Sequence, residues 1–235
     1  MPTPIELVVL DIAGTTIDDG QLVYRVLGET AIANGVPAAD VDINQWHGAA
    51  KHEALRAMLT ANRGTPPSDE VLQSVVTDFR DRLAAAYAAR PPVPLPGVTE
   101  ALADLRAAGI RIALTTGFDR DIVDALLPPL GWDGTSVADA IVCGSEVAAG
   151  RPAPYMIFRA MELTGVTDIS HVLVAGDTPR DLESGTNSGA AYVVGVLTGA
   201  SDAAELGTYR HTHLLASVAD LPAFLGVRSA LVSAS

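Results

Sequence analysis

Short runs of aliphatic residues recur along the chain, each bounded by polar residues or glycine. Runs of this length without strict polar alternation are typical of strands that a parallel sheet buries on both faces. The pattern predicts strands at residues 7–10, 110–116, 140–143, 171–175 and 191–196. Segments with helical spacing separate most of these runs, and this alternation favours an α/β fold, with a mostly parallel sheet and helices on both faces.

The pattern changes between residues 17 and 92, where apolar residues recur at helical intervals and no strand is predicted. The proline-rich segment 90–96 cannot lie inside a helix, so we interpret it as the second of two hinges. The sequence therefore predicts a catalytic core at residues 1–16 and 93–235, with a helical cap domain inserted at residues 17–92.

Composition narrows the class of partner. The 235 residues carry a formal net charge of −13, which argues against binding of nucleic acid or an anionic membrane. The longest apolar stretches have the length of strands, so we expect neither a transmembrane helix nor a signal peptide. The single cysteine, Cys143, cannot form an internal disulfide, which favours a cytoplasmic location. An anionic substrate then needs a local cationic pocket.

The hexapeptide Asp-Ile-Ala-Gly-Thr-Thr follows the first predicted strand. Asp11 is thereby placed at the carboxyl end of a buried strand, and Gly14 allows a sharp turn behind it. Such an aspartate can attack phosphorus and become an acyl phosphate when a cation neutralises the phosphoryl oxygens. Because an aspartate before a glycine also closes ordinary turns, the assignment depends on motifs further along the chain.

Two of these motifs offer groups that can hold a phosphoryl group. Ala-Leu-Thr-Thr-Gly places the hydroxyl of Thr116 and nearby backbone amides at a strand end. Gly-Arg-Pro-Ala-Pro places Arg151 just before a predicted helix, where its guanidinium would neutralise charge on Asp11 and on the phosphoryl group. A strand threonine and a surface arginine are the ordinary alternatives.

The last motif, Ala-Gly-Asp-Thr-Pro-Arg-Asp, follows a predicted strand. It carries two carboxylates four residues apart, Asp177 and Asp181, which suit a hard cation such as Mg²⁺. Ligands of open α/β sheets bind beyond the carboxyl ends of the strands. We therefore expect Asp11, Thr116 and Asp177 to converge.

Together these motifs resemble those of the haloacid dehalogenase superfamily, and more narrowly its phosphonoacetaldehyde hydrolase (phosphonatase) branch. The resemblance covers essentially the whole chain and implies a Rossmann-like α/β core with an inserted all-helical cap. It implies Asp11 as the nucleophile and Mg²⁺ held by Asp11, the backbone carbonyl of Ala13 and Asp177, with Asp181 supporting these ligands. The residues implied at the substrate are Ala13, His47, Gly48, Thr116, Gly117 and Arg151.

Two positions depart from most phosphatases of the superfamily and resemble the phosphonatase branch. Ala13 stands where those phosphatases have a second aspartate that protonates the leaving alkoxide, and Arg151 stands where they usually have lysine. Cleavage of a carbon–phosphorus bond instead leaves a carbanion, for which a lysine imine supplies an electron sink. Lys51, the only lysine in the chain, stands at the position that resembles the Schiff-base lysine of phosphonatases. A solvated surface lysine is the alternative.

Other positions depart from the phosphonatases themselves. His47 replaces the methionine before the cap glycine, Ala54 replaces a histidine three residues after the lysine, and Phe118 replaces a tyrosine. The replaced residues are thought to assist proton transfer around the imine, so that relay is absent or rebuilt. His47 and His52 are the candidates to rebuild it, and a cap histidine without a role is the alternative.

The leading hypothesis is a Mg²⁺-dependent phosphonatase-like hydrolase that acts on phosphonoacetaldehyde or a related small carbonyl phosphonate. The alternative is a phosphomonoesterase for a small phosphorylated metabolite, of the phosphoglycolate or sugar-phosphate type, with Lys51 serving only as a charge. A dehalogenase would not need a metal site at Asp177 and Asp181. A catalytically silent phosphometabolite-binding protein is disfavoured because the reactive residues are intact. A homodimer formed through the cap is left open.

Overall fold

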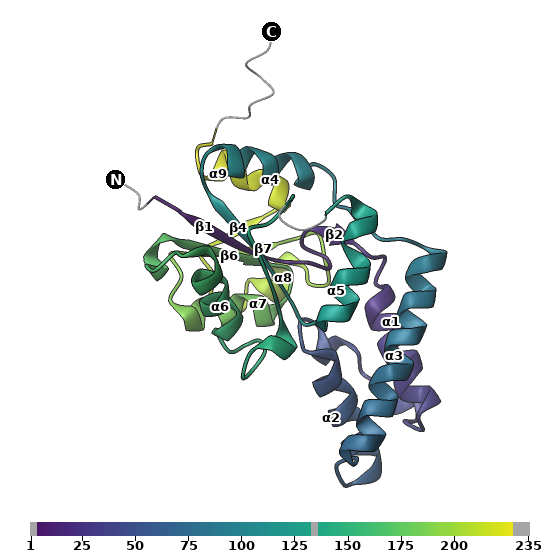
Figure 1. Cartoon of the computed structure of the whole chain (residues 1–235). Helices are drawn as coiled ribbons and strands as arrows, with labels where there is room; N and C mark the ends of the chain where they lie inside the picture. Colours follow the sequence, from purple (N-terminus) through teal and green to yellow (C-terminus); the bar gives the residue numbers. More distant parts are fainter. Residues whose placement is uncertain (1–3, 133–135, 228–235) are drawn as a thin grey trace.

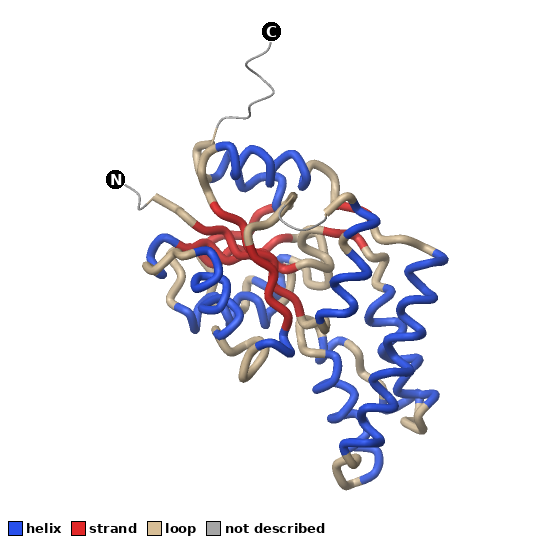
Figure 2. Tube along the Cα trace, viewed as in Figure 1, coloured by secondary structure: helices blue, strands red, loops and turns tan. Residues whose placement is uncertain are grey.

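The computed structural model describes residues 4–132 and 136–227. At its centre is a six-stranded sheet with the order β5-β4-β1-β6-β7-β8, in which every neighbouring pair is parallel (Figures 1 and 2). The α/β core and parallel sheet expected from the sequence are thus confirmed. The strands are β1 (Leu7–Asp11), β4 (Arg111–Thr116), β5 (Ala140–Cys143), β6 (Val172–Gly176), β7 (Tyr192–Val196) and β8 (His213–Leu215).

Helices cover both faces of this sheet (Figure 1). Alternate residues of β1 serve opposite faces, because side chains of a strand point alternately up and down. Val8 and Leu10 belong to the cluster that includes α4 (Val98–Ala107), α5 (Arg120–Leu126) and α9 (Leu221–Phe224). Leu7 and Val9 belong to the cluster that includes α6 (Tyr155–Thr164). On that side α6 also contacts α7 (Pro179–Ser188), which packs on β6 and β7, and α8 (Ala203–Leu206) lies beside α7.

Residues 17–92, called the cap segment below, are mostly helical. They contain α1 (Leu22–Ala33), α2 (Lys51–Arg63), α3 (Asp69–Ala89) and the short 3₁₀ turns Ala38–Asp40 and Asn44–Trp46. The prediction of no strand there was wrong at the boundary. Ile17–Asp18 forms β2, which pairs antiparallel with Val93–Pro94 (β3), so the two hinges lie side by side. A two-residue strand is too short to produce a hydrophobic pattern.

The cap segment has an apolar interior that explains its helices. Phe79 and Leu83 of α3 are fully buried and pack in one cluster with Leu59 of α2 and Val26 of α1. Ser68 caps the start of α3, since its hydroxyl accepts a hydrogen bond from a backbone N–H of the first turn. Phe79 and Leu83 lie four residues apart, which is the helical spacing that the sequence pattern indicated.

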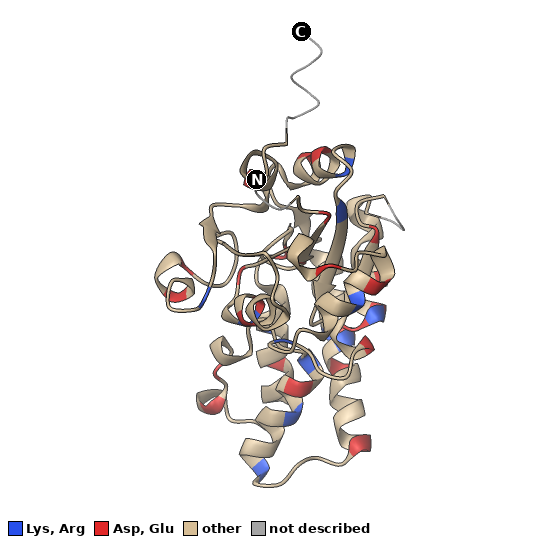
Figure 3. Ribbon diagram, turned by 90° about the vertical axis from the view of Figure 1, so that its left-hand side faces the viewer, with Lys and Arg blue, Asp and Glu red and all other residues tan. Residues whose placement is uncertain are grey.

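Acidic and basic positions are interspersed along the helices of core and cap segment (Figure 3). Among the described residues, no helix combines the length and the apolar character needed to cross a membrane. The ends of the predicted core ranges, residues 1–3 and 228–235, lie outside the described part of the chain.

Candidate active site

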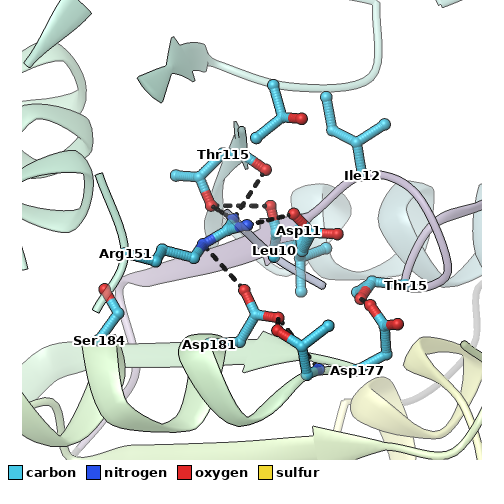
Figure 4. Close-up of polar contacts among 12 residues, drawn as sticks. Leu10, Asp11, Ile12, Thr15, Thr115, Arg151, Asp177, Asp181 and Ser184 are labelled. Atoms are coloured by element: carbon cyan, nitrogen blue, oxygen red, sulfur yellow. Dashed lines mark hydrogen bonds and ion pairs between the residues drawn. The ribbon is translucent and has the colours of Figure 1, made fainter. Parts of the chain in front are cut away.

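Three parallel strands bring the predicted motifs to one edge of the sheet, where the side chains of Asp11, Arg151 and Asp181 point toward one another (Figure 4). Asp11 ends β1 and lies in register with Thr115 of β4, Thr116 ends β4, and Asp177 follows the end of β6. β1 lies between β4 and β6, so the carboxylate of Asp11 occupies the middle of this edge. Segments more than a hundred residues apart in the sequence therefore meet as expected for ligand sites of open α/β sheets.

The guanidinium of Arg151 lies at the centre of a buried polar network. Its Nη1 contacts Asp11 Oδ1 at 2.6 Å, its Nε contacts Asp181 Oδ1 at 2.9 Å, and its Nη2 donates to Thr115 Oγ1 at 2.6 Å. Arg151 is only 5% exposed, so both ion pairs are shielded from water. Burial alone would lower the pKa of Arg151, but Asp181 and Asp11 raise it above its usual value. The guanidinium thus stays charged and orients the Asp11 carboxylate.

Asp181 has a second task at the start of α7. Its Oδ2 accepts hydrogen bonds from the backbone N–H of Thr178 at 3.1 Å and from the Thr178 hydroxyl at 2.5 Å. The side chain thereby closes a capping box, which fixes the first turn of the helix. The same carboxylate holds Arg151 with its other oxygen, so the helix start positions the guanidinium.

The two threonines that end β4 have different environments. Thr115 contacts Arg151 through its hydroxyl and also through its carbonyl, which accepts from Nη2 at 3.0 Å. The hydroxyl of Thr116 accepts a hydrogen bond from the backbone N–H of Phe118 at 3.1 Å. The sequence motif predicted that Thr116 contacts the phosphoryl group, and it did not single out Thr115. Alternation along the strand was the signal that could have separated them.

The carboxylate of Asp177 is held by two loops. Oδ1 accepts from the Thr15 hydroxyl at 2.8 Å, and Oδ2 accepts from the backbone N–H of Ala200 at 2.7 Å. Gly14, with φ of 87°, comes so close that a Cβ there would lie 2.6 Å from Asp177 Oδ2. Neither contact was predicted: the backbone N–H of Ala200 carries no sequence signature, and the motif did not assign a role to the Thr15 hydroxyl.

The electrostatics of this edge favour a bound cation. Burial raises the pKa of Asp11 to about 6; Arg151 opposes that rise and Asp181 adds to it. Burial raises the pKa of Asp177 to about 8, and the nearby carboxylates of Asp11 and Asp181 add to it. Carboxylates forced together in a low dielectric become easier to ionise when a cation balances them.

Hard oxygen ligands are available at Asp11, Asp177 and the backbone carbonyl of Ala13, and this donor set suits Mg²⁺. Over residues 4–132 and 136–227, no group of three or more histidine, cysteine, aspartate or glutamate side chains could hold a metal ion. A site built here would therefore use two side-chain carboxylates and complete its coordination with the carbonyl and water.

A loop of the cap segment, residues 47–50, seats on this edge and is called the cap loop below. A Cβ on Gly117, which follows β4, would lie 2.6 Å from the carbonyl oxygen of Ala49. Gly48 lies against the Thr178 side chain on the other side of β1. Arg180 bridges the two parts, since its guanidinium donates to the carbonyls of Arg151 at 3.3 Å and Gln45 at 3.4 Å. The cap segment thus closes over Asp11.

Lys51 begins α2 directly after the cap loop and is 5% exposed, which excludes the solvated surface lysine considered from the sequence. Its Nζ donates to the carbonyl of Ala49 at 2.9 Å and lies 4.7 Å from the ring centroid of Tyr24 and 5.9 Å from that of Phe118. Burial lowers the pKa of Lys51 to about 8; Asp11 opposes this shift and Arg151 adds to it. This shift brings the pKa of the amine closer to physiological pH and so increases its neutral fraction.

The two candidate histidines lie in different places. The ring of His47 packs edge-on against Tyr24 with centroids 4.3 Å apart, beside Lys51. Burial and the Lys51 charge lower the pKa of His47, which favours the neutral imidazole. His52 instead lines a separate groove of about 360 Å³ with Arg56 and Asp119. Of the two, His47 is the one in the neighbourhood of the amine.

Comparison with known proteins agrees with this geometry. The family model for haloacid dehalogenase-like hydrolases matches residues 5–189. A phosphonoacetaldehyde hydrolase of Bacillus thuringiensis is 34% identical over 209 residues, which cover 84% of this chain and 78% of the relative. A phosphonoacetaldehyde hydrolase-like protein of Syntrophobacter fumaroxidans is 34% identical over 206 residues, covering 83% of this chain and 74% of that protein.

Solved structures show the same fold. A hydrolase from Pseudomonas syringae superposes with a TM-score of 0.80 at 21% identity, covering 94% of this chain and 98% of its own. A phosphonoacetaldehyde hydrolase-like protein from Oleispira antarctica gives a TM-score of 0.78 at 24% identity, with 96% and 92% covered. The chain is therefore a hydrolase that belongs to the haloacid dehalogenase superfamily, in its phosphonoacetaldehyde hydrolase-like branch.

Proposed function

We propose that this enzyme is a Mg²⁺-dependent phosphonatase that cleaves the carbon–phosphorus bond of phosphonoacetaldehyde or a related small carbonyl phosphonate. The observation that carries the proposal is the environment of Lys51. The only lysine of the chain is buried directly after the cap loop, with its pKa lowered to about 8 and Asp11 and Arg151 among the charges that act on it. A phosphate ester needs no amine, whereas a carbonyl phosphonate can condense with one.

In the proposed reaction, Lys51 acts on the substrate carbonyl and Asp11 acts on phosphorus. The neutral amine of Lys51 adds to the substrate carbonyl, a proton is taken up and water leaves, which forms a protonated imine. The Asp11 carboxylate, held by Arg151, attacks phosphorus as the carbon–phosphorus bond breaks. The bonding electrons pass to carbon and are delocalised onto the imine nitrogen as an enamine. Protonation at carbon and hydrolysis release acetaldehyde and free Lys51, and water hydrolyses the aspartyl phosphate to inorganic phosphate.

Asp11, Asp177 and the Ala13 carbonyl are the groups that we propose to hold Mg²⁺, with Asp181 in support. The raised pKa values of Asp11 and Asp177 support this assignment, because buried carboxylates at close range call for a balancing cation. When bound, Mg²⁺ supplies charge neutralisation at the phosphoryl oxygens. Thr116, Gly117 and Arg151 are proposed at the phosphoryl group, and His47 and Gly48 at the carbonyl end.

Release of inorganic phosphate across a panel of phosphonates and phosphate esters tests the proposed function. Phosphonoacetaldehyde or a close carbonyl phosphonate is expected to give the highest kcat/KM, and to give acetaldehyde or the matching carbonyl product in equal amount. If the enzyme instead releases phosphate efficiently from a phosphoglycolate- or sugar-type ester and leaves carbonyl phosphonates intact, it is the phosphomonoesterase that the sequence left open.

The alanine at position 13 predicts that the rate of phosphate ester hydrolysis depends strongly on the pKa of the leaving group. Alkyl phosphates are expected to be poor substrates, because no side chain at this position can protonate the alkoxide, whereas aryl phosphates need less help. Rates measured over a series of esters give the slope of log rate against leaving-group pKa. An Ala13→Asp variant is expected to hydrolyse alkyl phosphates at least about tenfold faster and to flatten the slope. A flat slope in the wild-type enzyme would mean that another residue acts as the acid.

Metal binding predicts a thermal shift. Mg²⁺ at about a hundred times its Kd should stabilise the folded state by about 2.7 kcal/mol, which for this chain length is roughly 5 to 10 °C in Tm. Asp177→Ala is expected to remove this shift, because one of two carboxylate ligands is lost. Asp139→Asn, at the opposite end of β4, is the matched control and should keep it. An undiminished shift in Asp177→Ala would contradict the assignment.

The remaining features stay predictions. These are the boundaries of core (residues 1–16 and 93–235) and cap domain (residues 17–92), a cytoplasmic location, and a homodimer through the cap.

A further inference from the structure

Tyr24, on the first turn of α1, connects the cap loop to Lys51 and was not singled out by any motif. Its ring is nearly buried, and its hydroxyl oxygen accepts a hydrogen bond from the backbone N–H of Gly48 at 3.0 Å. The face of the same ring lies 4.7 Å from Lys51 Nζ, measured to the centroid. The ring of His47 packs against it in a T-shaped arrangement. One side chain thus contacts the cap loop at two residues and the amine.

We propose that Tyr24 is a positioning residue that holds the Lys51 amine in its reactive place, an inference that rests on the proposed function of Lys51. Its hydroxyl fixes the Gly48 peptide, which is followed by Ala49, whose carbonyl accepts the hydrogen bond from Nζ. Its ring face holds the ammonium through a cation–π contact. Removing Tyr24 would release the amine and its hydrogen-bond acceptor together.

The ring of Phe118 also lies beside the amine. Phe118 stands where phosphonatases have tyrosine, and its ring centroid lies farther from Nζ, at 5.9 Å. Of these two rings beside the amine, only that of Tyr24 carries a hydroxyl. The ring that lies nearer to the amine therefore comes from α1. This position lies nearly thirty residues before Lys51 in the sequence, so no local pattern links the two.

Tyr24 acts by position and not as a base. Burial raises its pKa well above its usual value, and the charge of Asp177 adds to that shift, so its hydroxyl stays neutral. Burial is the main cause of the lowered pKa of Lys51. The charged or titratable groups that act on the amine besides Tyr24 are Asp11, Asp19, His47, Arg151 and Arg180. Against this background the ring face favours the ammonium form, so loss of the ring should lower the Lys51 pKa further.

The single lysine makes the test direct. Reductive methylation with formaldehyde and cyanoborohydride, followed by peptide mass spectrometry, reports the reactivity of Lys51 separately from the α-amino group. Measured from pH 6 to 10 in wild-type enzyme, the rate should have its midpoint near 8. Tyr24→Leu is expected to lower the midpoint by about one unit, and Tyr24→Phe, which keeps the ring, by less than about 0.3 units. Pentafluorophenylalanine at position 24 keeps the shape but reverses the ring's charge distribution, so it should behave like leucine.

Phe118→Leu is the matched control, because it makes the same kind of change at the more distant ring, and it should shift the midpoint less than Tyr24→Leu. With phosphonoacetaldehyde, Tyr24→Leu should lower kcat at least about tenfold and change KM by less than about threefold. The proposal would be overturned if Tyr24→Leu and Phe118→Leu both had the wild-type midpoint. It would also be overturned if the two variants shifted the midpoint equally. If wild-type enzyme does not cleave the phosphonate, the proposed function fails, yet the methylation data still decide whether Tyr24 holds the amine.

Discussion

An Asp11→Asn enzyme is expected to fold normally and to lose turnover by at least about a thousandfold, because an amide does not attack phosphorus. The substitution keeps the shape of the side chain. Its carbonyl oxygen can still accept the hydrogen bond that Arg151 Nη1 donates to Asp11. Arg151 also keeps its ion pair with Asp181, so the buried guanidinium is not left without a carboxylate. Phosphate release from phosphonoacetaldehyde measures the loss, and circular dichroism checks the fold.

Asp139→Asn makes the same chemical change where no reaction is proposed. The Asp139 carboxylate accepts a hydrogen bond from the backbone N–H of Ile112 at 2.8 Å, near the amino end of β4. Its turnover is expected to stay within about twofold of wild type, as for a change outside the site. An Asp11→Asn enzyme that keeps more than a few per cent of wild-type activity would show that Asp11 is not the nucleophile.

Lys51→Arg is expected to preserve the positive charge under the cap loop and to lose carbon–phosphorus cleavage by at least about a thousandfold. A guanidinium does not become neutral at working pH and cannot form the imine. Weak hydrolysis of aryl phosphates should survive, because that reaction uses Asp11 and Arg151 but no amine. The ratio of the two activities, measured on one preparation, separates loss of imine chemistry from general damage.

The pH dependence gives a second measurement of the same residue. Since the pKa of Lys51 is lowered to about 8, the fraction of neutral amine increases as pH rises through 8, and cleavage of the phosphonate should rise with it.

The matched control for Lys51→Arg is Arg56→Lys, an exposed exchange on the same helix, which should leave phosphonate cleavage and aryl phosphate hydrolysis unchanged. If Lys51→Arg cleaves phosphonoacetaldehyde at the wild-type rate, Lys51 is only a charge beside the phosphate.

The core of the fold was predictable because each of its long strands contains a short aliphatic run. The same runs located Asp11, Thr116 and Asp177, since residues that follow parallel strands must meet at one edge of the sheet. β8 escaped prediction because only three residues form it, at the edge of the sheet. β2 escaped for the same reason, although it brings the two hinges together.

The parts of the site that sequence could not supply depend on contacts between distant segments. No sequence motif singled out Tyr24, and only the seating of the cap loop brings it to Lys51. The backbone N–H of Ala200 holds Asp177, and any residue except proline could provide it. Alternation along β4 separates the chemically identical Thr115 and Thr116, but only the placement of Arg151 assigns Thr115 to it.

Borohydride trapping during turnover tests the central claim most directly, because it reads the imine itself. Wild-type enzyme with phosphonoacetaldehyde is expected to carry an N-ethyl group on Lys51 after reduction, since the carbon–phosphorus bond breaks while the substrate is attached. Asp11→Asn enzyme should instead carry the intact phosphonoethyl group on Lys51, because the imine forms but the phosphoryl group has no acceptor. Absence of any adduct on Lys51 in both proteins, while wild-type enzyme releases phosphate from this substrate, would contradict the account.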